Sequence, residues 1–204
     1  MFHSAAMSAY SKELENALKN YIDNRADGKV EVRQLLQQMS SVDRYSLLMN
    51  VRGNWNSYAG PHIATIYNDL GTMKYMLQEL TGDQKFDVLN IQSSGGISAL
   101  HFAAWHGYSS IITYLLTDLS QQQKFNLLQL QQKKGDTPLH DAASQEKPEA
   151  VQAILTSLSP QQHIQLLNIK NKKGQTVTDI RPEVYKEIPV LISQGIVILH
   201  ILQL

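Results

Sequence analysis

The sequence has no cysteine, no net charge and no leader-like start, and each of these absences excludes a class of protein. With no cysteine among 204 residues, disulfide frameworks, thiolate zinc sites and cysteine nucleophiles are excluded. The 18 basic residues balance the 18 acidic ones, so no overall field favours nucleic acid or an anionic membrane as a partner. The start, MFHSAAMSAYSKELENAL, lacks the basic residues and apolar core of a secretory signal peptide. We therefore expect a cytoplasmic protein, with export by a non-classical route left open.

No motif for catalysis or for cofactor binding is visible. The sequence contains no Ser-His-Asp order, phosphate loop or metal motif. Gly95-Gly96 predicts a hairpin turn and not a nucleotide fingerprint, because no strand and acidic residue frame it. His62, His101 and His140 recur at one spacing, but side chains on successive packed elements lie about 10 Å apart, too far for a shared ion with bonds of about 2 Å. We predict a non-enzyme without cofactor or metal.

The strongest positive signal is a repeat of 39 residues. In GISALHFAA, residues 96–104, the spacing of Leu100, Ala103 and Ala104 predicts a short helix with a narrow apolar face. Gly107 ends that helix, and the apolar residues of 111–116 predict a second one. The stretch GDTPLHDAA, residues 135–143, repeats the first motif, and weaker copies begin near His62 and Gly174. Such short helix pairs need stacked neighbours to bury their apolar faces.

The linkers between these helix pairs predict a third helix in each repeat. They read QELTGDQKFDVLNIQ, TDLSQQQKFNLLQLQ and TSLSPQQHIQLLNIK, and the segment from Ser40 to Leu48 starts the same pattern. Each linker has the spacing of a capping box, in which two side chains satisfy free N–H groups at a helix start: Thr81 with Gln84, Ser120 with Gln123, and Ser159 with Gln162. We expect the third helix over 120–130 and its equivalents, with Phe86, Leu89, Phe125, Leu128, Ile164 and Leu167 as buried anchors.

The TPLH-x-A signature and its copies resemble the ankyrin repeat over residues 42–180. This resemblance implies an all-α ankyrin repeat solenoid of about three to four repeats, with β-hairpin fingers and here an extra short helix per repeat. It implies that the repeated histidine ties adjacent repeats through backbone hydrogen bonds. It also implies a non-catalytic module that binds a partner protein in a concave groove. The lengthened repeats, rich in Gln and Asn, resemble ankyrin arrays in effector proteins of intracellular bacteria, which implies action on host proteins.

Two flanking segments complete the predicted organisation. Residues 1–41 predict a helical hairpin, with helices over 8–26 and 29–39 and a stop at Ala26-Asp27-Gly28, that caps the array. A separate recognition hairpin is the alternative. Residues 181–204 form a degenerate repeat or apolar tail, in which 188–204 is shorter than the roughly 20 apolar residues of a spanning helix. We expect this tail to dock as a C-terminal cap, with a membrane or partner contact as the alternative.

The resemblance also implies which positions face a partner. At the finger tips these are Ser94, Gly95, Ile97, Lys133, Lys134, Asp136, Lys172, Lys173 and Gln175. On the concave helices they are Ile66, Tyr67, Trp105, His106, Ser144 and Gln145. Aromatic residues beside a lysine ridge are typical of binding hot spots, although lysines at turns are often only solvated.

We expect a monomer that binds a protein segment with an apolar anchor followed by acidic residues. One alternative is a membrane-tethered adaptor that uses the C-terminal tail. The other is an enzyme with its site near the N-terminus, which is disfavoured because about 45 residues are too few to enclose a buried site.

Overall fold

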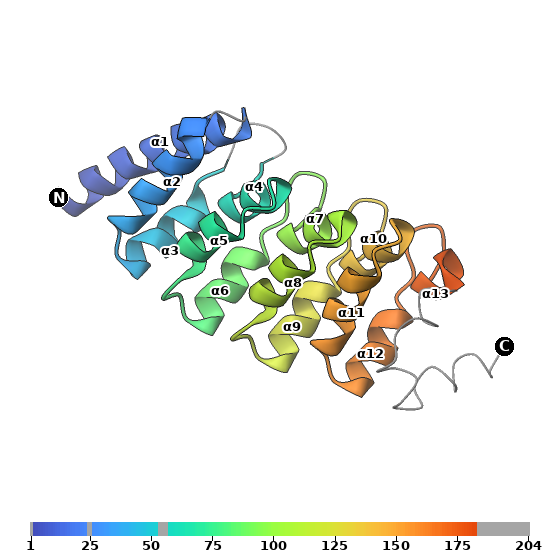
Figure 1. The fold of residues 1–204 in the computed structure, drawn as a ribbon. Coiled ribbons are helices and arrows are strands. Elements are labelled where there is room, and N and C mark those ends of the chain that lie inside the picture. Colours follow the sequence, from blue (N-terminus) through green and yellow to red (C-terminus); the bar gives the residue numbers. More distant parts are fainter. Residues whose placement is uncertain (1, 24–25, 53–56, 183–204) are drawn as a thin grey trace. The chain divides into compact units, whose positions relative to one another are not determined.

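A computed structural model describes residues 2–23, 26–52 and 57–182 of the chain. Within these ranges the chain forms 13 α-helices and no β-strand, so the predicted all-α class is confirmed (Figure 1). The chain divides into two compact units, Met1–Ala99 and Leu100–Leu204, and each has its own core. Within the predicted C-terminal tail, residues 183–204 lie outside the described residues.

The first unit consists of two successive sets of three helices. Its helices are α1 (Phe2–Ile22), α2 (Ala26–Gln37), α3 (Ser41–Asn50), α4 (Gly60–Ile66), α5 (Leu70–Leu77) and α6 (Gly82–Leu89). Helix α1 packs on α4, α2 on α5 and α3 on α6. The N-terminal hairpin together with α3 therefore repeats the arrangement of the three helices that follow it, although it lacks their sequence signature.

The boundary between the first two helices was predicted wrongly. Helix α1 ends at Ile22, and Ala26-Asp27-Gly28 begins α2 instead of ending α1. Gly28 lies where a Cβ atom would contact the backbone nitrogen of Tyr21. The glycine thus allows α2 to approach α1 closely, which is a packing role. Leu14, Leu18 and Tyr21, which share one face of α1, are buried.

The second unit continues the pattern of three helices per repeat. Its helices are α7 (Ala99–His106), α8 (Ser109–Leu116), α9 (Gln121–Leu128), α10 (Pro138–Ser144), α11 (Pro148–Thr156), α12 (Pro160–Leu167) and α13 (Val177–Ile180). Within this unit α8 packs on α11, α9 on α12, and α10 on both α11 and α13. The alanine pairs 103–104 and 142–143 are fully buried, as expected where small side chains let helices approach closely.

The predicted third helices α6, α9 and α12 are confirmed, together with their three capping boxes. In α9, for example, the Ser120 hydroxyl accepts a hydrogen bond from the backbone N–H of Gln123 at 3.2 Å. The Gln123 side chain accepts from the backbone N–H of Ser120 at 2.9 Å. The helix runs from Gln121 to Leu128 and ends two residues before the predicted end. Each capping box thus marks its helix start correctly, and the sequence overestimates only the helix length.

Half of the predicted anchors of these third helices are wrong. The leucines at 89, 128 and 167 are buried, but Phe86 and Phe125 are only half-buried and Ile164 is 40% exposed. The second buried position is instead the residue before each leucine, which is Val88, Leu127 or Leu166. Because a helix turns by about 100° per residue, the last two apolar residues can both face the core while the earlier predicted anchor lies at the edge of that face.

The fingers are tight turns without strands in the residues described. In the finger at 132–136, the N–H of Gln132 donates to the Asp136 carbonyl at 3.0 Å, and the N–H of Gly135 donates to the Gln132 carbonyl at 2.7 Å. Gly135 has φ +83°, a conformation that glycine reaches at little cost. Two backbone bonds give the predicted hairpin shape but are too few for a ladder of strands.

Candidate functional site

The three repeated histidines hold the scaffold together and are not open sites. The Nε2 atom of His62 lies 2.9 Å from the Ile97 carbonyl, that of His101 lies 3.1 Å from the Asp136 carbonyl, and that of His140 lies 3.3 Å from the Gln175 carbonyl. Burial lowers the pKa of His62 to about 4, so this ring is neutral at physiological pH. The predicted structural role of these histidines is confirmed.

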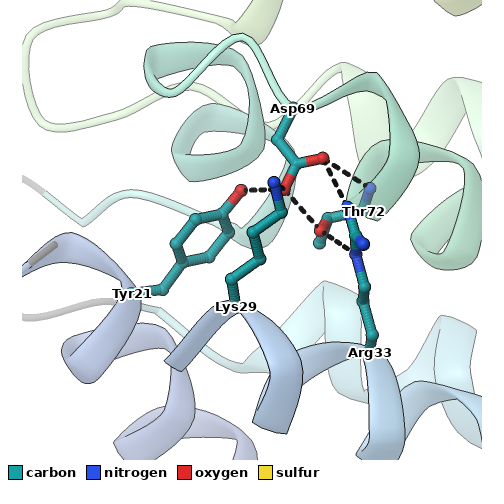
Figure 2. A network of polar contacts seen from close by, with 5 residues as sticks. All are labelled: Tyr21, Lys29, Arg33, Asp69 and Thr72. Atoms are coloured by element: carbon teal, nitrogen blue, oxygen red, sulfur yellow. Dashed lines mark hydrogen bonds and ion pairs between the residues drawn. The ribbon is translucent and has the colours of Figure 1, made fainter. Parts of the chain in front are cut away.

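A buried carboxylate in the first unit gathers donors from three helices (Figure 2). Asp69, the N-cap of α5, accepts from the Tyr21 hydroxyl at 2.7 Å, the Lys29 ammonium at 2.9 Å and the Arg33 guanidinium at 2.7 Å. It also accepts from the backbone N–H of Thr72 at 3.0 Å and from the Thr72 hydroxyl at 2.7 Å. These bonds fasten the hairpin of α1 and α2 to the start of α5. The sequence analysis missed this network.

The electrostatics of the network indicate a structural role. Burial alone would raise the pKa of Asp69, but the hydrogen bonds from the Thr72 backbone, Lys29, Tyr21 and the Thr72 hydroxyl outweigh it and hold the pKa well below its usual range. Burial, together with the adjacent Asp69, raises the pKa of the Tyr21 hydroxyl. Asp69 therefore stays ionised with its donors in place, and it offers neither a base nor a vacant ligand position.

Tyr67 contacts the N-terminal hairpin, contrary to its predicted place on an open binding face. Its ring stacks on Tyr21, with 5.2 Å between ring centroids, and its hydroxyl donates to the Ile22 carbonyl. The preceding Ile66, also predicted to contact a partner, is only half-buried. The prediction did not foresee that α1 packs on α4, which brings Tyr21 against the ring of Tyr67. We therefore leave Tyr67 out of the candidate surface.

The helix residues predicted in the second unit lie at or near the surface. Trp105, near the end of α7, is 44% exposed. His106 is exposed and stacks on Tyr108, with 5.3 Å between ring centroids. At the equivalent positions one repeat later, Ser144 is exposed and Gln145 is half-buried. Trp105 is thus a large aromatic at a position where the next repeat has a serine.

The predicted finger residues of this unit fall into two groups. The side chains of Lys133, Lys134, Lys172 and Lys173 are exposed, and none of them forms an ion pair with any part of the chain that the structure describes. Asp136 and Gln175, by contrast, use their backbone carbonyls to accept from the repeated histidines. The lysines are therefore available to a partner, whereas Asp136 and Gln175 connect adjacent repeats through their backbone carbonyls.

Adjacent fingers of the second unit are bonded to one another. The backbone N–H of Lys172 donates to the Lys134 carbonyl at 3.0 Å. The Asn171 amide donates to the Asp136 carboxylate at 2.8 Å, and the Gln131 amide donates to the Lys170 carbonyl at 2.9 Å. The four lysines are therefore carried by two fingers whose register is fixed.

Comparisons with known proteins agree with this architecture. A sequence model of three ankyrin repeats matches residues 61–168. The chain belongs to the ankyrin repeat family, and the predicted ankyrin repeat class is confirmed. Members of this family are generally protein–protein interaction modules and are typically non-catalytic. No curated protein matches the chain in a sequence search.

Two further searches concern the described residues alone. None of the helices in 2–23, 26–52 and 57–182 is both long and apolar enough to cross a membrane. The same ranges contain no group of three or more His, Asp or Glu side chains arranged to hold a metal ion.

Proposed function

We propose that the chain is a non-catalytic binding module whose second unit holds an extended segment of a partner protein. The observation that carries this proposal is the exposed Trp105 on α7, in the same unit as two bonded fingers that carry four unpaired lysines. Trp105 is the apolar anchor, and the lysines at 133, 134, 172 and 173 form the charged rim. The polar surface at Ser144, Gln145 and His106 completes the contact.

The energetic argument concerns the anchor first. Tryptophan is among the residues most enriched at the centres of interfaces, because its large ring gains much contact area while ordering few torsions. The equivalent residue of the next repeat is Ser144, so the repeat itself does not need a large aromatic at this position. In the free protein Trp105 is 44% exposed. A partner that buries this apolar surface gains binding free energy.

The rim defines the charge of the partner. Four exposed lysines without ion pairs in the described ranges create a local positive potential, although the chain as a whole is neutral. Such charges at the edge of an interface mainly speed association and select partners of opposite sign. The partner segment therefore carries acidic residues beside its apolar anchor.

A cellular role is part of the proposal. The lengthened, Gln-rich linkers that form α6, α9 and α12 are similar in style to ankyrin arrays of effector proteins from intracellular bacteria. We assign the chain the same role, as an effector that acts as a monomer on a host protein. The absence of cysteine is compatible with its acting in a reducing cytoplasm.

Site-specific photo-crosslinking tests the proposed surface. A photoreactive phenylalanine analogue replaces Trp105 in one variant and Ile164 in another, because Ile164 is a similarly exposed apolar residue of the same unit, at 40%. We expect a host-cell lysate to give a distinct protein adduct with the analogue at position 105 and not at 164. Equal adducts at both positions, or an adduct only at 164, would contradict the assignment of the surface.

A further inference from the structure

We propose that Asp141 is a second anchor of the binding surface, which takes a basic side chain of the partner. The proposal rests on the proposed function and adds a specific chemical group to it: a guanidinium or ammonium group that pairs with the Asp141 carboxylate. The partner segment then carries a basic residue in addition to its apolar anchor and acidic residues.

Asp141 is a buried carboxyl that lacks an internal donor. It lies in the first turn of α10 and is only 6% exposed. In the ranges that the structure describes, its carboxyl group accepts no hydrogen bond and forms no ion pair. A buried polar group without a partner is destabilising, and an ionised one is more so. Asp69 is equally buried, but its carboxylate is stabilised by donors from four residues.

The carboxyl group of Asp141 is nevertheless not completely enclosed. In the described part of the chain, the side-chain polar atoms that are fully enclosed and unpartnered are Nε of Arg44 and Nδ1 of His163. The Asp141 oxygens are not among them, so a ligand atom can reach them. We refer to this buried carboxyl group, with its limited access to solvent, as the Asp141 recess.

The neighbouring charges show why the recess favours a cation. Burial, and then the nearby Asp136, raise the pKa of Asp141 to about 7, while Lys134 opposes the effect only in part. The Asp136 carboxylate itself is already used, because it accepts from the Asn171 amide at 2.8 Å and from the Gln132 amide at 3.1 Å. Burial and the nearby Asp136 both disfavour the ionised carboxylate, so a positive group that pairs with it would relieve both effects.

The register of the repeat joins this recess to the Trp105 surface. Asp141 occupies the position equivalent to Phe102, 39 residues earlier, and Phe102 precedes Trp105 by three residues on α7. Residues three apart lie on one side of a helix. Trp105 and Asp141 therefore belong to the same surface of successive repeats in the second unit. An arginine is the best fit, since its planar group pairs with a carboxylate through two bonds and also stacks on aromatic rings.

The test uses a small cation and needs no identified partner. N-acetyl-arginine amide is titrated into the full chain labelled with ¹³C at aspartate carboxyls, above pH 7, and N-acetyl-citrulline amide is its uncharged counterpart. We expect the arginine probe, and not citrulline, to move the Asp141 carboxyl resonance to saturation. Asp141→Asn should weaken binding about tenfold or more, whereas Asp118→Asn, at an exposed aspartate of the same unit, should leave it unchanged.

Lowering the pH gives an independent measurement on the unaltered chain. The charged groups that act on Asp141 are Asp136, which raises its pKa, and Lys134, which lowers it. Binding of the arginine probe should weaken as the pH falls through about 7, because Asp141 then takes up a proton. In Asp141→Asn, the residual binding should not change with pH in this range.

Two results would overturn this inference: an Asp141 resonance that does not respond to the arginine probe, or equal binding to wild type and Asp141→Asn. These results are distinct from a failure of the proposed function. A protein adduct at position 105 with no cation bound at Asp141 would remove the inference and leave the function standing. Arginine bound at Asp141 with no specific adduct at 105 would retain the recess and contradict the function.

Discussion

At the scale of single residues, two buried aspartates show how partners decide what a carboxylate does. Asp69 receives hydrogen bonds from Tyr21, Lys29, Arg33 and Thr72 and has a lowered pKa. The Asp141 carboxyl group receives no hydrogen bond from the residues described, and its pKa is raised. Asp69 therefore stabilises the fold at neutral pH. Asp141 lowers the stability of the free protein, and a bound cation would offset this loss.

Asp69→Asn should destabilise the first unit by about 3 kcal/mol, because it removes the charge that two cations and a tyrosine share. The lowered pKa of Asp69 means that its contribution is fully present above the ordinary value of 3.8 and is lost as the pH falls below it. Denaturant unfolding across this pH range measures both effects.

The control for this prediction is Asp118→Asn, at an exposed aspartate of the second unit. It should change the free energy of unfolding by no more than about 0.5 kcal/mol, as surface substitutions usually do. If Asp69→Asn were as stable as this control, the network would contribute nothing to docking of the N-terminal hairpin.

At the scale of single elements, two finger glycines form a matched pair with different neighbours. Gly135 and Gly174 have similar φ values of +83° and +77°. A Cβ atom on Gly135 would lie 2.6 Å from the backbone nitrogen of Lys172, whereas one on Gly174 would meet nothing within 4 Å. Both glycines are needed for their backbone conformation, but only Gly135 also allows the next finger to approach.

Alanine at either glycine should therefore cost about 1 kcal/mol for the left-handed conformation. Gly135→Ala should cost at least about 1 kcal/mol more, because it displaces the hydrogen bond from Lys172 to the Lys134 carbonyl. Denaturant unfolding measures the difference in free energy of unfolding between the two variants. Faster amide hydrogen exchange at Lys172 would show that the bond between the fingers is the one lost. Equal losses in the two variants would show that the bond between the fingers is dispensable.

The capping boxes give a second prediction at this scale. The Ser159 hydroxyl accepts from the backbone N–H of Gln162 at 3.4 Å, and α12 begins at Pro160. Ser159→Ala should cost about 1 kcal/mol in thermal or denaturant unfolding. Ser110→Ala is the comparison, because Ser110 is exposed within α8 and alanine is the better helix former there. A variant at Ser159 as stable as that at Ser110 would rule out a contribution from the cap.

Local signals explain why most elements could be predicted from the sequence. A capping box, a Gly after a helix and a TPLH motif act over a few residues, so the starts of α6, α9, α10 and α12 follow from the sequence alone. The role of Gly28, by contrast, depends on how closely α2 packs on α1, which no local motif reports. For the same reason the donors around Asp69, which come from α1 and α2, could not be predicted from the sequence.

At the scale of the whole molecule, the balance of charge hides a local excess. The chain has 18 residues of each sign, but the finger lysines of the second unit have no acidic partners in the described residues. The lysine ridge was predictable because turn residues are exposed in any ankyrin repeat. The contact of Tyr67 with the N-terminal hairpin could not be predicted. The hairpin lacks the repeat signature that would have indicated its packing on α4.

Charge reversal tests the ridge. Lys133→Glu with Lys172→Glu should slow association with the captured partner by about tenfold at low salt, and the effect should shrink as salt screens the charges. Lys12→Glu with Lys74→Glu makes the same change of net charge at exposed lysines of the first unit and should leave the rate nearly unchanged. Association rates from surface plasmon resonance at several salt concentrations compare the two. An equal effect of both pairs would point to net charge and not to the ridge.

The most direct measurement of the central claim is the affinity of the partner captured at position 105 for Trp105→Ala. Trp105 is exposed and lies outside the buried core, so the variant should unfold like the wild type. We predict that its Kd rises by about thirtyfold or more, mostly through faster dissociation. Ile164→Ala, at another exposed apolar residue of this unit, should bind normally. An unchanged Kd for Trp105→Ala would contradict the claim that this surface holds the partner.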